Sequence, residues 1–382
     1  MKKILFIVPS MKGGGVEKVL LNMIKALPKD KYEMTVMAIL DEGERKEELP
    51  PNVNYRYVWK RAFYIGSKRI RGTDRLFQVI FKKLSPKLLH KIFIKENYDI
   101  EVDYWGQEGL KLILGGKNNI KKLSFIHTDM NAEGMRHAIF PFKNSKELRK
   151  AYLTMDYIVN VSDDCRKSMQ ERFKLVGDEQ KKNVVRYNIN LNSEIIQKSN
   201  EEIELIHNQN KFILCTSGRL CQPKGFERLV YICHRLREQD IKFELWILGE
   251  GEKRKDLEAV IDKYELKECV KLLGYQKNPY KYMAKSDLFV CSSFYEGFST
   301  VVSEAVILGI PIVTTDCTGA KEILGDSEYG LVTGIDDDSL FEGLRKMLTD
   351  KQLYQYYKNK VLERQAFFDI NKVVTEIEQL FE

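Results

Sequence analysis

Cysteine is present in this chain without any pattern that would give it a structural task. The 382 residues include seven cysteines, an odd and scattered set with no CxxC or Cys/His ligand spacing. Such a set excludes a disulfide framework and a structural zinc site, and it favours a reducing compartment. The sequence therefore predicts a cytoplasmic protein that folds without covalent or metal staples.

Long hydrophobic runs are missing as well. The first apolar run, Ile4 to Val8, is too short for a signal-peptide core or a membrane span, so we interpret it as a first strand. The composition, 43% apolar and 31% charged, is typical of a soluble globular protein. A length of 382 residues favours two domains over one.

Two familiar nucleotide-binding fingerprints are absent. The glycines at 13–15 follow the first strand as GGGVEK, which is not GxGxxG, and the loop at 216–225 contains no GK[ST]. A dinucleotide site of the NAD type and a Walker phosphate loop are therefore not expected. Gly14 and Gly15 either let the backbone approach a ligand or form a plain turn between a strand and a helix.

Short buried strands alternate with amphipathic helices along both halves of the chain. In the second half we expect strands at 212–217, 242–248, 269–273, 287–292 and 310–314, and helices at 225–239, 252–263, 278–284 and 300–308. This alternation predicts an α/β fold with doubly wound parallel sheets. The expected domains are 1–190 and 191–365, followed by a C-terminal helix within 366–382 that packs back on the first domain.

The segment 292–313 carries the densest signal of a ligand site. Ser299 is expected to cap a helix whose first N–H groups point at an anion. Glu296 precedes this helix and Glu304 lies on it, so two carboxylates can contact different ends of one extended, hydroxyl-rich ligand. Taken singly, each glutamate would instead be interpreted as a solvated surface charge.

A second loop, at 216–225, brings Arg219 and Lys224 to the start of the next helix. The two cations would neutralise a diphosphate there, although two solvated loop charges are an equally simple interpretation. A literal DxD at 336–338 precedes an amphipathic helix. We therefore interpret it as a capping cluster and not as a metal site.

These motifs together resemble those of the retaining GT-B glycosyltransferases of family 4. The likeness is strong over 211–335, where Arg219, Lys224, the GEG at 249–251, the LLGY at 272–275 and the Glu296/Glu304 pair match. It is weaker over the first half, where GGGVEKVLLN, His127 and VSDDCRKSM match. The resemblance implies two Rossmann-like domains that face a cleft, with the acceptor on the first domain and a nucleotide-sugar donor on the second.

Residue roles follow from the same resemblance. Arg219 and Lys224 would bind the donor diphosphate, Glu296 and His127 would contact the transferred sugar, and these four are the expected catalytic residues. Glu304 would contact the ribose, and Gly274 and Tyr275 would lie near the base. The full implied donor site is Gly14, Gly15, Gly218, Arg219, Lys224, Gly249, Gly274, Tyr275, Glu296, Gly297, Phe298, Ser299, Thr300, Val301 and Glu304.

The implied reaction transfers a sugar, with retention, from a UDP-sugar (favoured) or a GDP-sugar to a glycan or lipid-linked acceptor in surface polysaccharide synthesis. In this family the leaving phosphate is thought to take the acceptor proton, so no protein base, metal or other cofactor is expected. The alternatives are another GT-B enzyme, such as a sugar-nucleotide epimerase or a phosphorylase, and a non-catalytic protein that binds a sugar nucleotide or nucleic acid.

An uneven charge distribution predicts a further partner. Residues 1–190 contain 37 Lys+Arg against 23 Asp+Glu, whereas residues 191–382 contain 25 against 32. Between Arg56 and Lys95 an apolar stripe (Phe77, Ile80, Phe81, Leu84, Leu88 and Ile92) runs among Arg75, Lys82, Lys83, Lys87 and Lys91. This pattern suits an anionic membrane surface, a solvated face over an ordinary core stripe, or nucleic acid. A lipid-linked acceptor favours peripheral binding at the inner face of the plasma membrane, with no nucleic acid partner.

Overall fold

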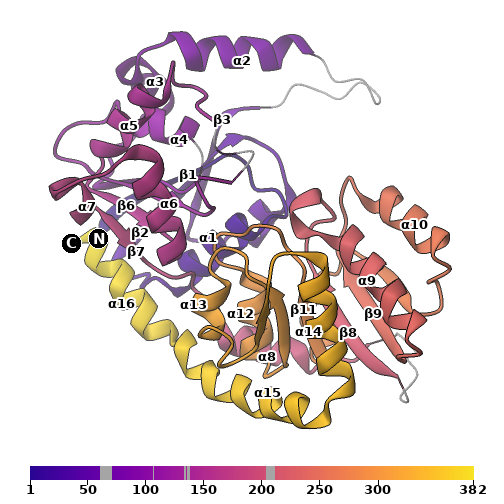
Figure 1. The fold of residues 1–382 in the computed structure, drawn as a ribbon. Coiled ribbons are helices and arrows are strands. Elements are labelled where there is room, and N and C mark those ends of the chain that lie inside the picture. Colours follow the sequence, from indigo (N-terminus) through magenta and orange to yellow (C-terminus); the bar gives the residue numbers. More distant parts are fainter. Residues whose placement is uncertain (61–70, 106, 133–134, 136–137, 204–210) are drawn as a thin grey trace. The chain divides into compact units, whose positions relative to one another are not determined.

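The computed structural model describes residues 1–60, 71–105, 107–132, 135, 138–203 and 211–382, without the side chains of 71–76. The chain forms two compact units (Figure 1). Unit 1 is Met1–Ile189 together with Asn371–Glu382, and unit 2 is Asn190–Ile370. Each unit has its own fully parallel sheet with helices around it, which confirms the predicted α/β fold.

Unit 1 is built on a seven-stranded sheet with the order β3-β2-β1-β4-β5-β6-β7. Its strands are β1 (Lys2–Val8), β2 (Tyr32–Leu40), β3 (Asn54–Trp59), β4 (Ile100–Asp103), β5 (Lys121–Ile126), β6 (Tyr157–Asn160) and β7 (Asn183–Val185). Its helices include α1 (Gly15–Ala26), α2 (Arg71–Lys83), α3 (Pro86–Phe93), α4 (Gln107–Ile113), α5 (Ser145–Leu153), α6 (Asp163–Phe173), α7 (Asp178–Lys181) and α16 (Ile370–Phe381).

The central strand of unit 1 explains why this sheet must be covered on both faces. Ile4, Leu5, Phe6 and Ile7 are all fully buried, so neither face of β1 meets water. An uninterrupted apolar run of this kind is typical of a parallel sheet between two layers of helices. β1 pairs with β2, with Lys2 opposite Tyr32, and with β4, with Ile4 opposite Ile100.

The last helix, α16, is part of unit 1 although the chain reaches it through unit 2. Val373, Ile377, Leu380 and Phe381 are buried, at the helical spacing that gives one apolar face. Lys2 Nζ donates a hydrogen bond to the carbonyl of Phe381 at 2.7 Å, so both ends of the chain meet in this unit.

Unit 2 is built on a six-stranded sheet with the order β10-β9-β8-β11-β12-β13. Its strands are β8 (Phe212–Ser217), β9 (Phe243–Leu248), β10 (Val270–Gly274), β11 (Leu288–Cys291), β12 (Ile312–Thr315) and β13 (Leu331–Thr333). Its helices include α8 (Asn192–Ser199), α9 (Phe226–Glu238), α10 (Arg254–Lys263), α11 (Tyr280–Met283), α12 (Thr300–Ile307), α13 (Ala320–Leu324), α14 (Asp337–Thr349) and α15 (Lys351–Arg364).

The order of these strands fixes where a ligand site can form. β8 pairs with β9, its neighbour in sequence, and on its other side with β11, with Leu214 opposite Leu288. The loops after β8 and β11 therefore leave the sheet at a topological switch point, where open α/β sheets bind their ligands. These are the two loops that the sequence marked.

Two elements differ from the sequence prediction. Helix α8 lies just after the expected domain boundary, where no helix was predicted. Its Ile195 is buried, while the other residues give it little apolar periodicity. The helix expected at 278–284 is only the short α11. Within the described parts of the chain, none of the helices combines the length and the apolar character that a membrane span requires.

Candidate functional site

Three glycine-containing loops of unit 2 meet at the carboxyl edge of its sheet. Gly218 follows β8, Gly249 follows β9 and Gly274 ends β10. The N–H of Gly249 donates to the carbonyl of Gly274 at 2.8 Å. Gly249 has a φ of +144°, and a Cβ there would lie 1.9 Å from the carbonyl oxygen of Gly218. Glycine is required at this position, and the loops meet there as bare backbone.

Lys224 and Glu296 form an ion pair at the switch point. Lys224 Nζ lies 2.6 Å from Glu296 Oε1, and the two side chains are only 24% and 12% exposed. The hydroxyl of Ser293 donates to the same carboxylate oxygen at 2.7 Å. Burial alone would lower the pKa of Lys224, but the attraction of Glu296 outweighs it, so the pKa of Lys224 is raised and the ammonium stays charged.

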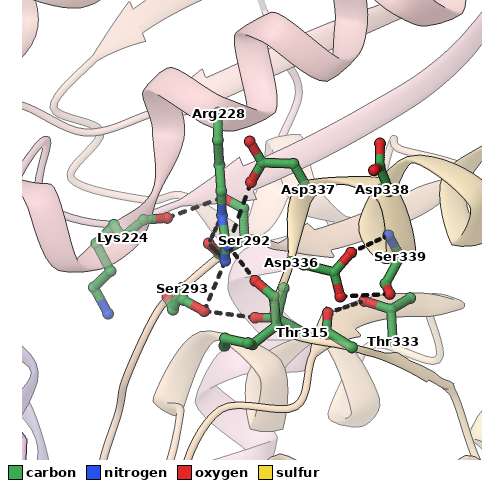
Figure 2. A network of polar contacts seen from close by, with 12 residues as sticks. Lys224, Arg228, Ser292, Ser293, Thr315, Thr333, Asp336, Asp337, Asp338 and Ser339 are labelled. Atoms are coloured by element: carbon green, nitrogen blue, oxygen red, sulfur yellow. Dashed lines mark hydrogen bonds and ion pairs between the residues drawn. The ribbon is translucent and has the colours of Figure 1, made fainter.

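Backbone contacts hold the two loops that carry this ion pair. The hydroxyl of Ser292 donates to the carbonyl of Lys224 at 2.9 Å, as Figure 2 shows. The N–H of Phe294 donates to the carbonyl of Pro223 at 2.8 Å. The cation and the carboxylate thus come from segments about 70 residues apart, and their separation is set by a small network of hydrogen bonds.

Helix α12 begins directly after the Glu296 loop. Ser299 occupies the N-cap position, but its side chain makes no capping hydrogen bond, contrary to the expected cap. Its buried Oγ has no hydrogen-bond partner within the described part of the chain. The first N–H groups of the helix, from Thr300 and Val301, are therefore not occupied by this side chain, and the helix dipole adds positive potential. Phe298 beside them is buried, and Gly297 precedes it.

Glu304 lies inside unit 2, one helical turn further along α12. Its side chain is 2% exposed, and the hydroxyl of Tyr280 lies 3.5 Å from its Oε1. The interpretation of Glu304 as a solvated surface residue is therefore wrong. A carboxylate held at this depth beside a helix N-terminus can accept hydrogen bonds from a hydroxyl-rich ligand.

Two other residues of the expected site are turned to solvent. Arg219 is exposed in the loop after β8, and Tyr275 is 60% exposed after β10. Their side chains lie at the edge of unit 2 and are not part of the Lys224–Glu296 hydrogen-bond network. Both remain accessible to a ligand that extends along the carboxyl edge of the sheet.

His127 follows β5 in unit 1, among aromatic rings. Its ring centroid lies 4.8 Å from that of Tyr104 and 6.1 Å from that of Trp105. Burial lowers its pKa to about 3, so the imidazole is neutral at physiological pH. Nε2 has no hydrogen-bond partner among the residues that the structure describes. A neutral histidine can offer a ligand a hydrogen bond but no charge.

The glycines at 13–15 form the turn between β1 and α1. Gly14 is the N-cap residue of α1 in an extended conformation, and Gly15 opens the helix. A Cβ on Gly13 would meet nothing within 4 Å, so the backbone here is open. Both earlier interpretations, a plain turn and a backbone approach to a ligand, are compatible with this geometry.

The basic segment divides between core and surface. Phe77 and Phe81 are buried in the core of unit 1, with Ile80 and Leu84 packed against it, which is the ordinary core-facing role. Leu88 and Ile92, on α3, are instead 43% and 42% exposed, so a single apolar stripe is wrong. Ser85 caps α3 with Pro86 at its start, and this break rotates the second half of the stripe away from the core. Lys82, Lys83, Lys87 and Lys91 are exposed; the side chain of Arg75 lies outside the described residues.

The DxD at 336–338 begins a helix, as predicted. Asp336 is the N-cap of α14 and accepts a hydrogen bond from the N–H of Ser339 at 2.8 Å. Among the described residues, no group of three or more His, Cys, Asp or Glu side chains is arranged to hold a metal ion.

One residue of this region was missed by sequence reasoning. Arg228, on the first turn of α9, is 7% exposed and contacts the loop that carries Glu296. The sequence offered one signal: Arg228 directly precedes the apolar residues Leu229 and Val230 in the expected helix.

The fold matches known structures over its whole length. HepE of Anabaena, crystallised in complex with UDP and glucose, covers 99% of both chains with a TM-score of 0.73 and 20% sequence identity. At this identity the likeness concerns the fold, which is that of a GT-B protein. Fold and carboxyl-edge site together define the class.

Sequence comparison places the chain within that class. A family model described as Glycosyltransferase Family 4 matches residues 13–188, and one described as Glycosyl transferases group 1 matches residues 197–364. The chain belongs to these GT-B glycosyltransferases.

Two relatives share part of the sequence. An N-acetylgalactosamine-N,N'-diacetylbacillosaminyl-diphospho-undecaprenol 4-alpha-N-acetylgalactosaminyltransferase of Campylobacter jejuni is 43% identical over 46% of this chain and 47% of its own length. An uncharacterized glycosyltransferase of Methanocaldococcus jannaschii is 31% identical over 60% of this chain and 64% of its own length. The match thus spans about half of the length of the Campylobacter relative and somewhat under two thirds of that of the Methanocaldococcus relative.

Proposed function

We propose that this chain transfers a sugar from a nucleoside-diphosphate sugar, with retention at the anomeric carbon and without a metal ion. The observation that carries the proposal is the Lys224–Glu296 pair, 2.6 Å apart beside the N-terminus of α12 at the carboxyl edge of unit 2. A fixed cation next to helix N–H groups that the Ser299 side chain does not cap suits a diphosphate. A carboxylate at the same point suits the hydroxyl groups of a sugar.

The proposed reaction gives each of these residues a role. Lys224, assisted by Arg219 and the first turn of α12, stabilises the negative charge that develops on the diphosphate as its bond to the anomeric carbon breaks. The acceptor hydroxyl attacks on the same face, its oxygen forms the new bond, and its proton passes to the leaving phosphate oxygen. Glu296 orients the sugar, and the neutral His127 supplies a hydrogen bond. Glu304 receives the ribose hydroxyls.

A UDP-sugar is the favoured donor and a GDP-sugar the second choice. The HepE structure, which shares the fold, contains UDP. The acceptor we propose is a glycan or lipid-linked sugar in surface polysaccharide synthesis. The name of the Campylobacter relative includes a diphospho-undecaprenol-linked sugar, which supports an acceptor of that kind.

A lipid-linked acceptor requires the protein to work at a membrane. Helix α3 offers exposed apolar side chains, Leu88 and Ile92, among the exposed lysines 87 and 91. Exposed apolar groups ringed by cations favour the boundary of an anionic bilayer. We therefore propose peripheral binding at the inner face of the plasma membrane through this surface.

A thermal-shift screen with UDP, GDP, ADP, CMP and their sugar conjugates, with and without EDTA, tests the donor assignment. Ligand binding to the native state raises its apparent stability. We expect a shift with UDP and its sugars that EDTA leaves unchanged. A shift that EDTA abolishes would contradict metal independence, and no shift with any nucleotide would contradict the donor site. Binding to DNA without turnover of any sugar donor would instead favour a nucleic-acid binding protein.

A further inference from the structure

Arg228 is a buried charge for which the proposed reaction has no direct use. It lies on the first turn of α9, and its guanidinium is withdrawn from solvent against the loop that carries Glu296. Burying an arginine is costly unless its donors are satisfied, so its hydrogen bonds define its task.

The guanidinium joins segments that are far apart in sequence (Figure 2). Nε donates to the carbonyl of Ser292 at 2.9 Å, and Nη2 donates to the carbonyls of Ser292 and Ser293. Nη1 donates to the carbonyl of Ile335 at 2.6 Å, in the loop between β13 and α14. The ring of Phe294 covers the guanidinium at 3.9 Å, and Asp337 lies 3.8 Å away.

The two serines that Arg228 contacts also hold the ion pair. The hydroxyl of Ser293 donates to Glu296, and that of Ser292 donates to the carbonyl of Lys224. Thr315 Oγ1 also donates to the carbonyl of Ser293, at 2.6 Å. The carbonyls are thereby fixed on the side of Arg228, while the Ser293 hydroxyl meets the Glu296 carboxylate and the Ser292 hydroxyl meets the backbone of Lys224.

The backbone at Gly225 makes this contact possible. Gly225, which precedes α9, has a φ of +63°, and a Cβ there would lie 2.2 Å from the carbonyl oxygen of Ser292 and 2.8 Å from Arg228 Nε. Glycine therefore allows the start of α9 to approach the end of β11 closely enough for the guanidinium to reach both carbonyls.

We propose that Arg228 is a positioning residue, which sets the distance between Lys224 and Glu296 by holding the Ser292–Ser293 carbonyls against the start of α9. The inference rests on the proposed donor site. An arginine is suited to it because one rigid, planar group with five donors can bind several carbonyls in fixed directions. A lysine carries the same charge but cannot reproduce that fork.

The test compares Arg228→Lys and Arg228→Gln with Arg364→Gln. Arg364, also in unit 2, donates from Nε to the carbonyl of Ile323 at 2.7 Å and stacks on Phe367 at 3.8 Å. It is thus a matched arginine that binds backbone carbonyls away from the Lys224–Glu296 pair. Amide hydrogen exchange of the full chain without ligand, and the Kd for UDP, are measured for each variant.

We expect faster exchange in 222–226 and 292–299 for both Arg228 variants, and in 319–325 for Arg364→Gln. UDP affinity should fall about 10- to 100-fold in Arg228→Gln, since a displaced Lys224 loses a charge-assisted hydrogen bond to the diphosphate, which is worth about that much. It should fall nearly as far in Arg228→Lys and stay unchanged in Arg364→Gln. In a further variant, Arg228→Ala, added guanidinium ion should restore part of the affinity, because the residue lines a pocket of about 330 Å³.

Unchanged exchange at 292–299 in Arg228→Gln would overturn the positioning role, whether or not UDP binds. Altered exchange with UDP affinity no lower than in Arg364→Gln would show that the contact is structural only. Failure of the wild-type chain to bind UDP would contradict the UDP-donor proposal, and the exchange data would still decide whether Arg228 holds the loop.

Discussion

The Lys224–Glu296 ion pair keeps two opposite charges beside each other before any ligand arrives. Their mutual attraction offsets part of the cost of holding both groups away from water. In the proposed reaction, a diphosphate that approaches Lys224 would compete with Glu296, and the released carboxylate would become available to the hydroxyl groups of the sugar. Without a ligand, the two charges therefore neutralise each other.

Removing either member should stop transfer in a folded protein. For Lys224→Ala and Glu296→Ala we expect a loss of about 100- to 1,000-fold in transfer rate, the size seen when one preorganised charge-stabilising group is removed. Initial rates with a radiolabelled sugar donor measure this. Lys271→Ala is the matched control, since Lys271 pairs with the buried Glu244 at 2.8 Å near the start of β9, away from the carboxyl edge. Near-normal turnover in either test variant would contradict the site.

The depressed pKa of His127 makes stability depend on pH. Burial holds the folded-state pKa at about 3, below the ordinary value of 6.5. Between these values the unfolded chain binds a proton that the folded chain does not, so stability falls as the pH drops below 6.5. The loss from this residue at pH 5 is about 2 kcal/mol. Urea unfolding at pH 7 and pH 5 should show His127→Asn losing less stability than the wild type; parallel losses would contradict the buried neutral state.

For single residues, the sequence indicates which side chains belong to a candidate site better than it predicts which of them touch. Lys224 and Glu296 were recognisable because each follows a strand and precedes a helix, a pattern with a clear chemical use. Their direct pairing was not, because it depends on the position of β8 beside β11. Arg228 escaped prediction because an arginine in an amphipathic helix is ordinarily a solvated charge. Its burial depends on carbonyls that are more than 60 residues away.

Helix α3 shows how one break can change the use of a hydrophobic pattern. Before Ser85, Phe77, Ile80 and Phe81 of α2 pack into unit 1. Lys111 Nζ donates to the carbonyl of Phe81 at 2.6 Å, which ties the end of α2 to α4. After Pro86, the exposed apolar residues face outward. The sequence pattern predicted one apolar stripe. It could not predict that the two helices turn different faces to the core, because that core is formed by distant strands.

The exposed lysines of α2 and α3 should control binding to anionic vesicles. Neutralising Lys82, Lys83 and Lys87 to glutamine removes about 1 kcal/mol of attraction each, so affinity should fall on the order of 100-fold. Cosedimentation with phosphatidylglycerol vesicles measures this. The control replaces Lys143, Lys146 and Lys150, which are exposed elsewhere in unit 1. Equal losses in the two triple variants would indicate a diffuse charge effect and contradict a defined surface.

The apolar part of that surface has a separate signature. Leu88→Ser with Ile92→Ser should weaken vesicle binding at high salt as well as at low salt, since burial of apolar area is not screened. Cosedimentation across a salt series distinguishes the two contributions. If high salt abolishes wild-type binding completely, the contact is electrostatic only and these side chains do not insert.

At the scale of the whole molecule, unit 1 is built from two separate stretches of the chain, whereas unit 2 is built from one. Unit 1 includes α16, whose Ile377 is fully buried. Ile377→Ala should destabilise unit 1 by about 2–5 kcal/mol. Gln379→Ala, on the exposed side of the same helix, should change stability by less than about 0.5 kcal/mol. Amide hydrogen exchange should accelerate in β1 and β2 and not in β8 and β9; acceleration in both sheets would show that the units unfold as one.

The fold class was within reach of the sequence because strand and helix alternation predicts a parallel sheet wherever it occurs. Strand order was not, since the pattern of β1 or β8 carries no information about which strand pairs on either side. Helix α8 was not predicted for the same reason. It has few apolar residues, and only the folded unit shows that Ile195 among them is buried.

The route of the chain through unit 1, then unit 2, then back to α16 has a consequence for biosynthesis. Domains generally fold as units while the ribosome delivers the chain from its N-terminus. Residues 1–189 emerge before unit 2, yet the helix that completes their hydrophobic interior is translated only after 190–370. Unit 2 is therefore complete before unit 1. Until α16 has been translated, residues 1–189 expose the apolar surface that this helix covers. Nascent chains stalled before residue 371 should bind chaperones through unit 1.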